Sequence, residues 1–161
     1  MNTKIIVISL LSFLFIACGA TLKLSPLPNA VTANKNAKYF LKPVKAADTR
    51  MGEEGVSFYN VTMLDRLRKN NMYAQTMQNA DYVLVLTITK FQKREGASKY
   101  LFGAMAGSDG METTVQVRDA KSDKLLGHGT IGQSDSSILA SMNSMVEDSA
   151  DQVIDYLRGK K

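Results

Sequence analysis

The segment 82–91 constrains the fold most, because it is the most strand-like part of the chain. It reads YVLVLTITKF, which is apolar at first and then alternates apolar residues with Thr. A continuous run of apolar, β-branched residues is typical of a strand that is covered on both faces. We therefore expect a central strand here, with a sheet built around it.

Four further segments have strand patterns of differing strength. Residues 39–44 are one, and Pro43 favours placing this strand at a sheet edge or ending it there. Residues 111–118 alternate apolar and polar side chains, and 125–131 follow after a polar turn, so the two are expected to pair as a hairpin. A shorter candidate strand spans 72–77.

Two segments have helical periodicity. The first is 56–69, and the second is a regular apolar stripe over 138–157 that Ser134 or Asp135 could cap and Gly159 could end. The resulting order, β-α-β-β-β-β-α, predicts an α+β fold. We expect a two-layer sandwich in which a mostly antiparallel sheet of four to five strands is packed by two helices. The expected core residues are Leu84, Leu86, Ile88, Val115, Val117, Met142, Val146, Val153 and Leu157.

The N-terminus has the pattern of a secretory leader. Its apolar run, 5–16, is about 12 residues long, which suits a signal peptide and is too short to span a bilayer as a helix. The run ends at Ala17-Cys18-Gly19, which resembles the lipobox of bacterial lipoproteins, where the Cys thiol receives a diacylglyceryl group before cleavage. Phe15 departs from the usual Leu. An ordinary secretory leader with an incidental Cys, or a signal-anchor helix, are the alternatives.

The lipobox resemblance implies an organisation and a location. Residues 1–17 are then a lipoprotein signal peptide, 18–36 are a lipidated Cys with a flexible tether, and 37–161 form a single α+β domain. We expect the protein to be attached to a membrane through lipid at Cys18. Gly19, in place of Asp, implies a position on the periplasmic face of the outer membrane.

Composition narrows the chemistry. With one Cys and one His, the chain can form no internal disulfide and no structural zinc site, so we expect no metal. The net charge of +5 is spread along the sequence, and we expect no nucleic-acid partner. His128 has no second His or Cys as co-ligand, so a structural or surface role is expected. Asp119 and Asp123 are expected to shape a turn. We predict no catalytic residues and no cofactor, because no paired carboxylates or Ser-His-Asp order stand out.

Several motifs together resemble a known family. They are an AD-aliphatic strand at 80–84, a Gly-rich stretch at 100–108, a strand with an Asp-containing turn at 115–119, and Lys124-Leu125-Leu126. This combination is similar to a family of bacterial envelope lipoproteins known only as a domain of unknown function. The resemblance implies a small α+β fold like that of curli-secretion and penicillin-binding-protein-activator lipoproteins. Met105 stands where the family has its middle Gly, and the family carries over no catalytic residues.

The loop at 96–110 is the candidate contact site. It holds three glycines, Gly103, Gly107 and Gly110, but no Gly-Lys-Ser/Thr that would mark a phosphate loop. It also holds an apolar cluster: Tyr100, Leu101, Phe102 and Met105. These side chains either cover the sheet or contact a protein partner, a second copy or the membrane.

The leading functional hypothesis is a non-enzymatic envelope lipoprotein that binds or scaffolds another envelope component. The alternative is a carrier of a small ligand or lipid, with a pocket between sheet and helices. A small hydrolase is a more distant third.

Overall fold

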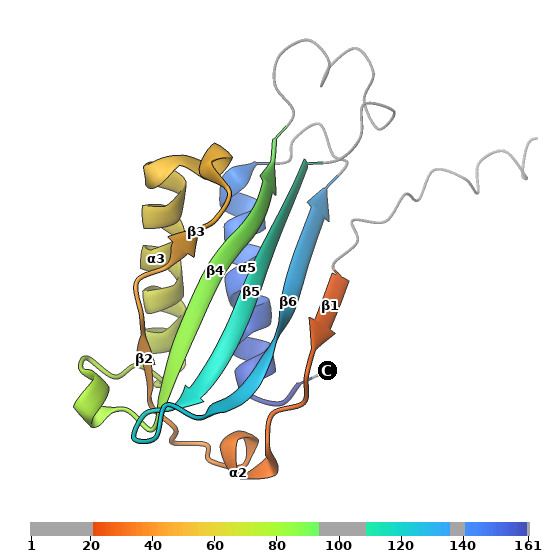
Figure 1. The fold of residues 1–161 in the computed structure, drawn as a ribbon. Coiled ribbons are helices and arrows are strands. Elements are labelled where there is room, and N and C mark those ends of the chain that lie inside the picture. Colours follow the sequence, from red (N-terminus) through yellow and green to blue (C-terminus); the bar gives the residue numbers. More distant parts are fainter. Residues whose placement is uncertain (1–20, 94–108, 136–140, 161) are drawn as a thin grey trace, which may run out of the picture.

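The computed structural model describes residues 21–93, 109–135 and 141–160, which form a sheet covered on one side by two helices (Figure 1). The strands are β1 Thr21–Leu24, β2 Tyr39–Leu41, β3 Lys45–Ala46, β4 Tyr82–Gln92, β5 Asp109–Asp119 and β6 Leu125–Asp135. The helices are α2 Asn29–Thr32, α3 Gly52–Lys69 and α5 Met142–Leu157, with 3-10 turns at η2 Thr49–Met51 and η3 Met77–Asn79.

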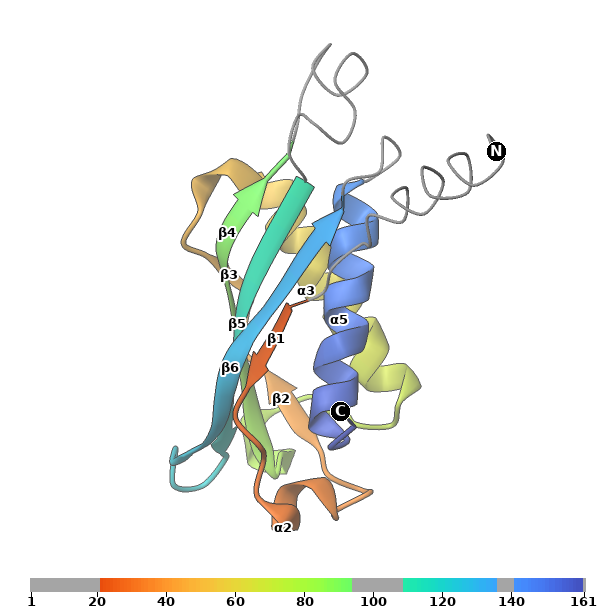
Figure 2. The same cartoon turned by 90° about the vertical axis from the view of Figure 1, so that its right-hand side faces the viewer.

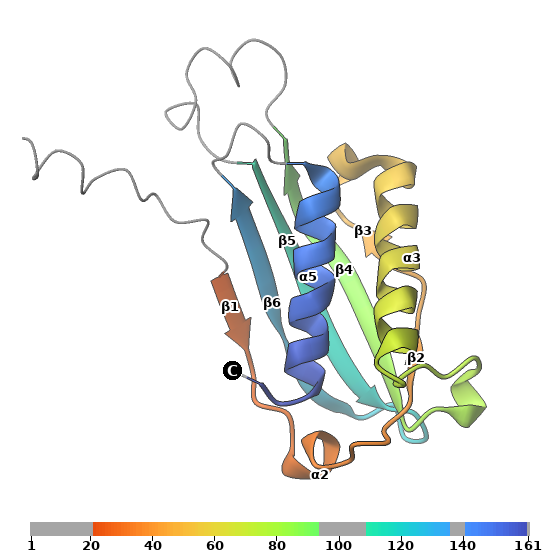
Figure 3. The same ribbon diagram turned by 180° about the vertical axis from the view of Figure 1, so that it is seen from behind.

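The six-stranded sheet has the order β1-β6-β5-β4-β2, and β3 also pairs with β4. In the series β1, β6, β5 and β4, each strand is antiparallel to the next. β2 and β3 both run parallel to β4. Figure 3 shows α3 and α5 lying side by side across one face of the sheet. The expected two-layer α+β sandwich with a mostly antiparallel sheet is confirmed, and the sheet has one strand more than the upper end of the expected range.

The core forms between the helices and the inner face of the long strands. Leu84, Leu86 and Ile88 of β4 are fully buried, as the apolar run predicted. The other expected core residues are also buried, except Met142, which is partly buried and packs against the core. Inside this layer, the hydroxyl groups of Tyr59 on α3 and Ser149 on α5 form a hydrogen bond of 2.6 Å. This bond satisfies two buried polar groups and ties the helices together.

Both helices begin at positions that differ from those expected. α3 starts at Gly52, so Glu53 and Glu54 lie in its first turn, where their charges favour the helix dipole. α5 starts at Met142 and is capped by Ser141, whose Oγ accepts a hydrogen bond from the Ser144 N–H at 3.1 Å. The expected caps, Ser134 and Asp135, are wrong, because pairing with β5 carries β6 through both residues.

The expected tether over 18–36 is wrong from Thr21 onward. Thr21–Leu24 pair with β6, and Asn29–Thr32 form a short helix that buries Val31. The Pro- and Asn-rich composition hid the alternation Thr-Leu-Lys-Leu, which fits a strand. Residues 21–36 therefore belong to the folded domain, which was expected to begin at residue 37.

Two shorter segments also differ from expectation. Residues 72–77 do not form a strand of the sheet: Tyr73 makes only an isolated bridge to Tyr39, and a 3-10 turn begins at Met77. Gly110 belongs to β5, where it pairs with Gln92 and Ser134, although it was expected in the loop. β5 and β6 thus extend further than the expected ranges 111–118 and 125–131.

Candidate functional site

Most of the candidate residues lie outside the described part of the chain, so predictions about them remain predictions. These residues are Cys18, Tyr100, Leu101, Phe102, Gly103, Met105 and Gly107. Among those described, Asp119 and Asp123 shape the β5–β6 turn as expected. The Asp119 carboxylate accepts hydrogen bonds from the Lys121 and Ser122 N–H groups, and Asp123 has a φ of 54°. Within the described ranges, no group of three or more His, Cys, Asp or Glu side chains could hold a metal ion.

The interior of the sandwich is filled by side chains. Tyr59, Met63 and Leu67 of α3 meet Val146, Val153 and their neighbours on α5 in one continuous core. A carrier pocket between sheet and helices would have to occupy this same space. The hollows found among the described residues lie instead at the surface, on the open face of the sheet, along its two edges and at the two ends of the helix layer.

One face of the sheet carries no helix (Figure 2). Thr87, Thr114 and Thr130 lie in register across β4, β5 and β6. Near one end, Lys23, Lys90 and Glu112 line a shallow hollow of about 320 Å³. A face with short polar side chains and mixed charges is well solvated, so this surface needs no partner to be stable.

β1 is the strand at one edge of the sheet. No described residue pairs with its outer side, and the Leu22 side chain is 50% exposed. On the helix side, an apolar groove of about 600 Å³ runs beneath the strand, lined by Leu22, Leu24 and Leu27 with Tyr156 and Lys160. We call β1 together with this groove the β1 edge. Free backbone groups beside exposed apolar side chains are what an additional strand can use.

Three contacts hold β1 in place. The Ser25 Oγ donates to the His128 carbonyl at 2.8 Å, and the His128 N–H donates to that Oγ at 2.9 Å. The Tyr156 hydroxyl of α5 donates to the Ser25 carbonyl at 2.9 Å. His128 thus has the structural role that was expected, through its backbone, while its side chain is exposed.

Two glycines of β6 allow this close approach. A Cβ at Gly129 would collide with the Lys23 carbonyl and with Leu24, and one at Gly127 would meet Leu27 and the Tyr156 hydroxyl. The sequence Gly127-His128-Gly129 was a signal that could have revealed a strand packed on β6. Glycine in a strand often marks the close approach of another backbone.

The opposite edge of the molecule carries a second groove, which we call the β3–α3 groove. It encloses about 540 Å³ between the β3 segment and α3, and its apolar wall consists of Pro43, Val44, Ala46 and Val56. Ser57 and Glu53 line its helical side. The Val44 N–H donates to Asn60 Oδ1 at 3.3 Å, which fixes the β3 segment against α3.

Asp48 anchors this edge to the central strand. Its carboxylate accepts hydrogen bonds from the Arg50 guanidinium at 2.6 Å and from the Phe91 N–H at 2.7 Å. These bonds hold the pKa of Asp48 well below its usual range, and the bond from Arg50 has the largest effect. Because the folded pKa is lowered, the stabilisation is present above the unfolded value, near pH 3.9, and is lost as the pH falls.

We therefore expect Asp48→Asn to lower the melting temperature at pH 7 and to reduce the acid sensitivity of the fold. The gap in melting temperature between wild type and variant should narrow as the pH falls below about 4, where the unfolded wild-type chain binds a proton at Asp48 that the folded protein does not bind. Thermal unfolding between pH 7 and pH 3 measures this. Asp148→Asn, the same change at an exposed position of α5, is the control. A constant gap at all pH values would contradict the assignment.

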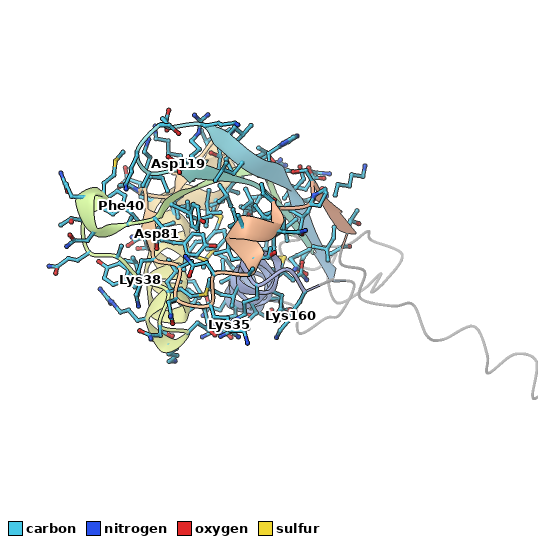
Figure 4. All side chains as sticks on the ribbon, turned by 90° about the horizontal axis from the view of Figure 1, so that it is seen from below. Lys35, Lys38, Phe40, Asp81, Asp119 and Lys160 are labelled. Atoms are coloured by element: carbon cyan, nitrogen blue, oxygen red, sulfur yellow. The ribbon has the colours of Figure 1, made fainter. Side chains whose placement is uncertain are left out.

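The end of the molecule near α2 is basic on its helix side. Figure 4 shows Lys35, Lys38 and Lys160 on this side and Asp119 on the opposite, sheet side. Lys38 Nζ donates to the Asn71 carbonyl at 2.6 Å, and Lys160 forms an ion pair with Asp155 at 3.1 Å. Two of the three cations thus have partners within the fold, at the C-terminal ends of α3 and α5, where positive charge favours the helix dipole.

Residues 25–140 match the family described as Domain of unknown function (DUF4410). The chain belongs to the DUF4410 family. The expectation of a family known only as a domain of unknown function is thereby confirmed, and the match begins inside the segment once expected to be a tether. No curated protein matches the chain in sequence.

Solved structures share the DUF4410 fold at low sequence identity. The chain is similar to a subunit of the PelC dodecamer from Paraburkholderia phytofirmans, with a TM-score of 0.66 and 13% identity, over 89% of this chain and 100% of that one. It is also similar to protein XCC0632 from Xanthomonas campestris, of the DUF330 family, with a TM-score of 0.52 and 14% identity, over 76% and 82% of the two chains. At these identities the likeness concerns the fold.

A third likeness, to a putative lipoprotein from Caulobacter crescentus, is weaker, with a TM-score of 0.44 and 14% identity over 80% and 93% of the two chains.

In the described part of the DUF4410 chain, none of the helices is long and apolar enough to span a bilayer.

Proposed function

We propose that this protein is a non-enzymatic lipoprotein of the cell envelope, which acts as a scaffold by assembling with copies of itself and binding another envelope component. Lipid on Cys18 would hold it on the periplasmic face of the outer membrane. The Cys18 context and the apolar leader support the anchor. The absence of a catalytic signature from the sequence supports a binding role.

The observation that carries the proposal is the β1 edge. Among the described residues nothing pairs with the outer side of β1, and Leu22 is half exposed. Such an edge is costly for a protein that remains alone, since it promotes pairing with other chains. A subunit with the same fold builds the PelC dodecamer. Self-assembly would pair this edge strand with another copy. Several small domains together would also offer the surface area that a scaffold needs.

The test is the mass of the full-length protein extracted from membranes in mild detergent. Native mass spectrometry should find oligomers at micromolar concentration, and crosslinking in the intact envelope should give multiples of the subunit mass. Crosslinks to a second envelope component would identify what the scaffold binds. A protein that is monomeric in both experiments, with no crosslinked neighbour, would contradict the proposal.

A further inference from the structure

The structure assigns a contact to this self-assembly: copies join head to tail, with Leu22 of the β1 edge in one copy entering the β3–α3 groove of the next. This inference rests on the self-assembly proposed above and adds which surfaces meet. The occupant of the groove is a second copy of this chain.

The inserted part is the helix-facing side of β1. Leu22 and Leu24 point to the side of the sheet on which α5 lies, since both line the groove beside Tyr156. Leu22 is the more exposed of the two, and its β1 neighbours Thr21 and Lys23 are also exposed. Burying the exposed half of this leucine side chain is favourable, because it removes apolar surface from water.

The receiving part is at the opposite end of the sheet and on the same side. The β3–α3 groove lies between the sheet edge and α3, and its apolar wall of Pro43, Val44 and Val56 suits an aliphatic side chain. In the described residues, β3 pairs only with β4, so its outer backbone groups are free for the incoming strand. The groove can therefore accept both a side chain and a short backbone pairing.

Strand directions agree with this arrangement. β1, β6, β5 and β4 alternate in direction, so β1 is antiparallel to β4, whereas β3 is parallel to β4. When two copies stand side by side in the same orientation, β1 of one copy is antiparallel to β3 of the next. The sheet then continues from copy to copy without a change of hand or face.

Register and anchoring favour the same contact. Leu22 pairs with Ile131, and through Thr113 and Ile88 this row of the sheet ends at Ala46, which lines the β3–α3 groove, so the two surfaces lie at the same level. Copies in one orientation also keep all their N-termini on the same side, as anchoring in a single membrane requires. An antiparallel pairing of two β1 strands would instead point the two N-termini in opposite directions.

A head-to-tail contact uses two different surfaces, so it propagates until a ring closes or a filament grows. Figure 1 shows β1 and the β3–α3 region on opposite sides of the molecule, which leaves both free in each copy. Blocking either surface in every copy should therefore abolish assembly. Blocking different surfaces in two populations should leave one productive contact.

The experiment uses the full-length protein in mild detergent and two variants, each with a matched control. Leu22→Lys places a charge on the β1 edge, and its control is Leu125→Lys, an exposed leucine of β6 away from that edge. Ser57→Arg places a bulky cation in the β3–α3 groove, and its control is Val61→Arg, an exposed residue of the same helix that does not line the groove.

We expect each blocking variant alone to be monomeric, with self-association weakened about tenfold or more, while the controls assemble like wild type. Mixing Leu22→Lys with Ser57→Arg should give a one-to-one dimer and nothing larger, because only one productive contact remains. Unchanged melting temperatures exclude misfolding. If wild type assembles but Ser57→Arg does so equally well, the head-to-tail contact is wrong and the scaffold proposal stands. If wild type itself is monomeric, both are wrong.

Discussion

Replacing Cys18 with serine should abolish acylation and release the protein from the membrane. Acyl transfer to the leader requires the nucleophilic thiolate of this single cysteine, and a serine hydroxyl does not provide it. Incorporation of a labelled fatty acid measures the modification, and fractionation of the envelope measures retention. We expect both to fall to background, because lipid is the only anchor that we assign to the chain.

Leu22→Lys is the control for this prediction, since it alters the β1 edge but leaves the residues around Cys18 intact. It should incorporate label like wild type. Undiminished labelling of Cys18→Ser would show that the leader is not a lipoprotein signal. Loss of labelling without release would show that a second attachment holds the protein.

Leu86→Ala should cost the domain about 2–5 kcal/mol of unfolding free energy, the largest stability effect that we expect from a single side chain. Leu86 is fully buried in the middle of β4, between β5 and the parallel strands, and belongs to the continuous core. Removing three carbon atoms there leaves a cavity that the surrounding side chains cannot fill without moving the sheet. Urea unfolding monitored by circular dichroism measures the loss.

Leu125→Ala is the matched control on the same sheet, because Leu125 is 43% exposed at the start of β6. Its loss should stay within about 0.5 kcal/mol. A cost of that small size for Leu86→Ala would mean that β4 does not lie at the centre of the fold.

The sequence revealed those elements whose side chains follow a long, regular pattern. The central strand, the β5–β6 hairpin and the apolar stripe of α5 all follow from periodicity, because burial on one face repeats every two or nearly four residues. Helix ends were less accessible. Ser134 and Asp135 have the chemistry of helix caps, but pairing with β5 extends β6 through them, and Ser141 caps α5 instead.

The candidate surfaces could not be predicted, because each depends on segments that are distant in sequence. β1 has only four residues, and its pairing with β6 depends on the room left by Gly127 and Gly129. The β3–α3 groove combines the turn around Pro43 with one side of a helix. Local patterns contain no information about which edges of a sheet remain open; that follows only from the strand order.

The position of β1 also has a consequence for the time course of folding. Ser25 and His128, which hold β1 on β6, are 103 residues apart, and Tyr156, which bonds to the Ser25 carbonyl, is 131 residues away. During export the N-terminal strand emerges first, yet its docking site is complete only when β6 and α5 have followed. Contacts of such long range form late, because the intervening chain must be ordered before they compensate its entropy. The strand nearest the proposed anchor therefore stays undocked through most of folding, which would leave it accessible to enzymes that lipidate Cys18 if the proposed modification occurs.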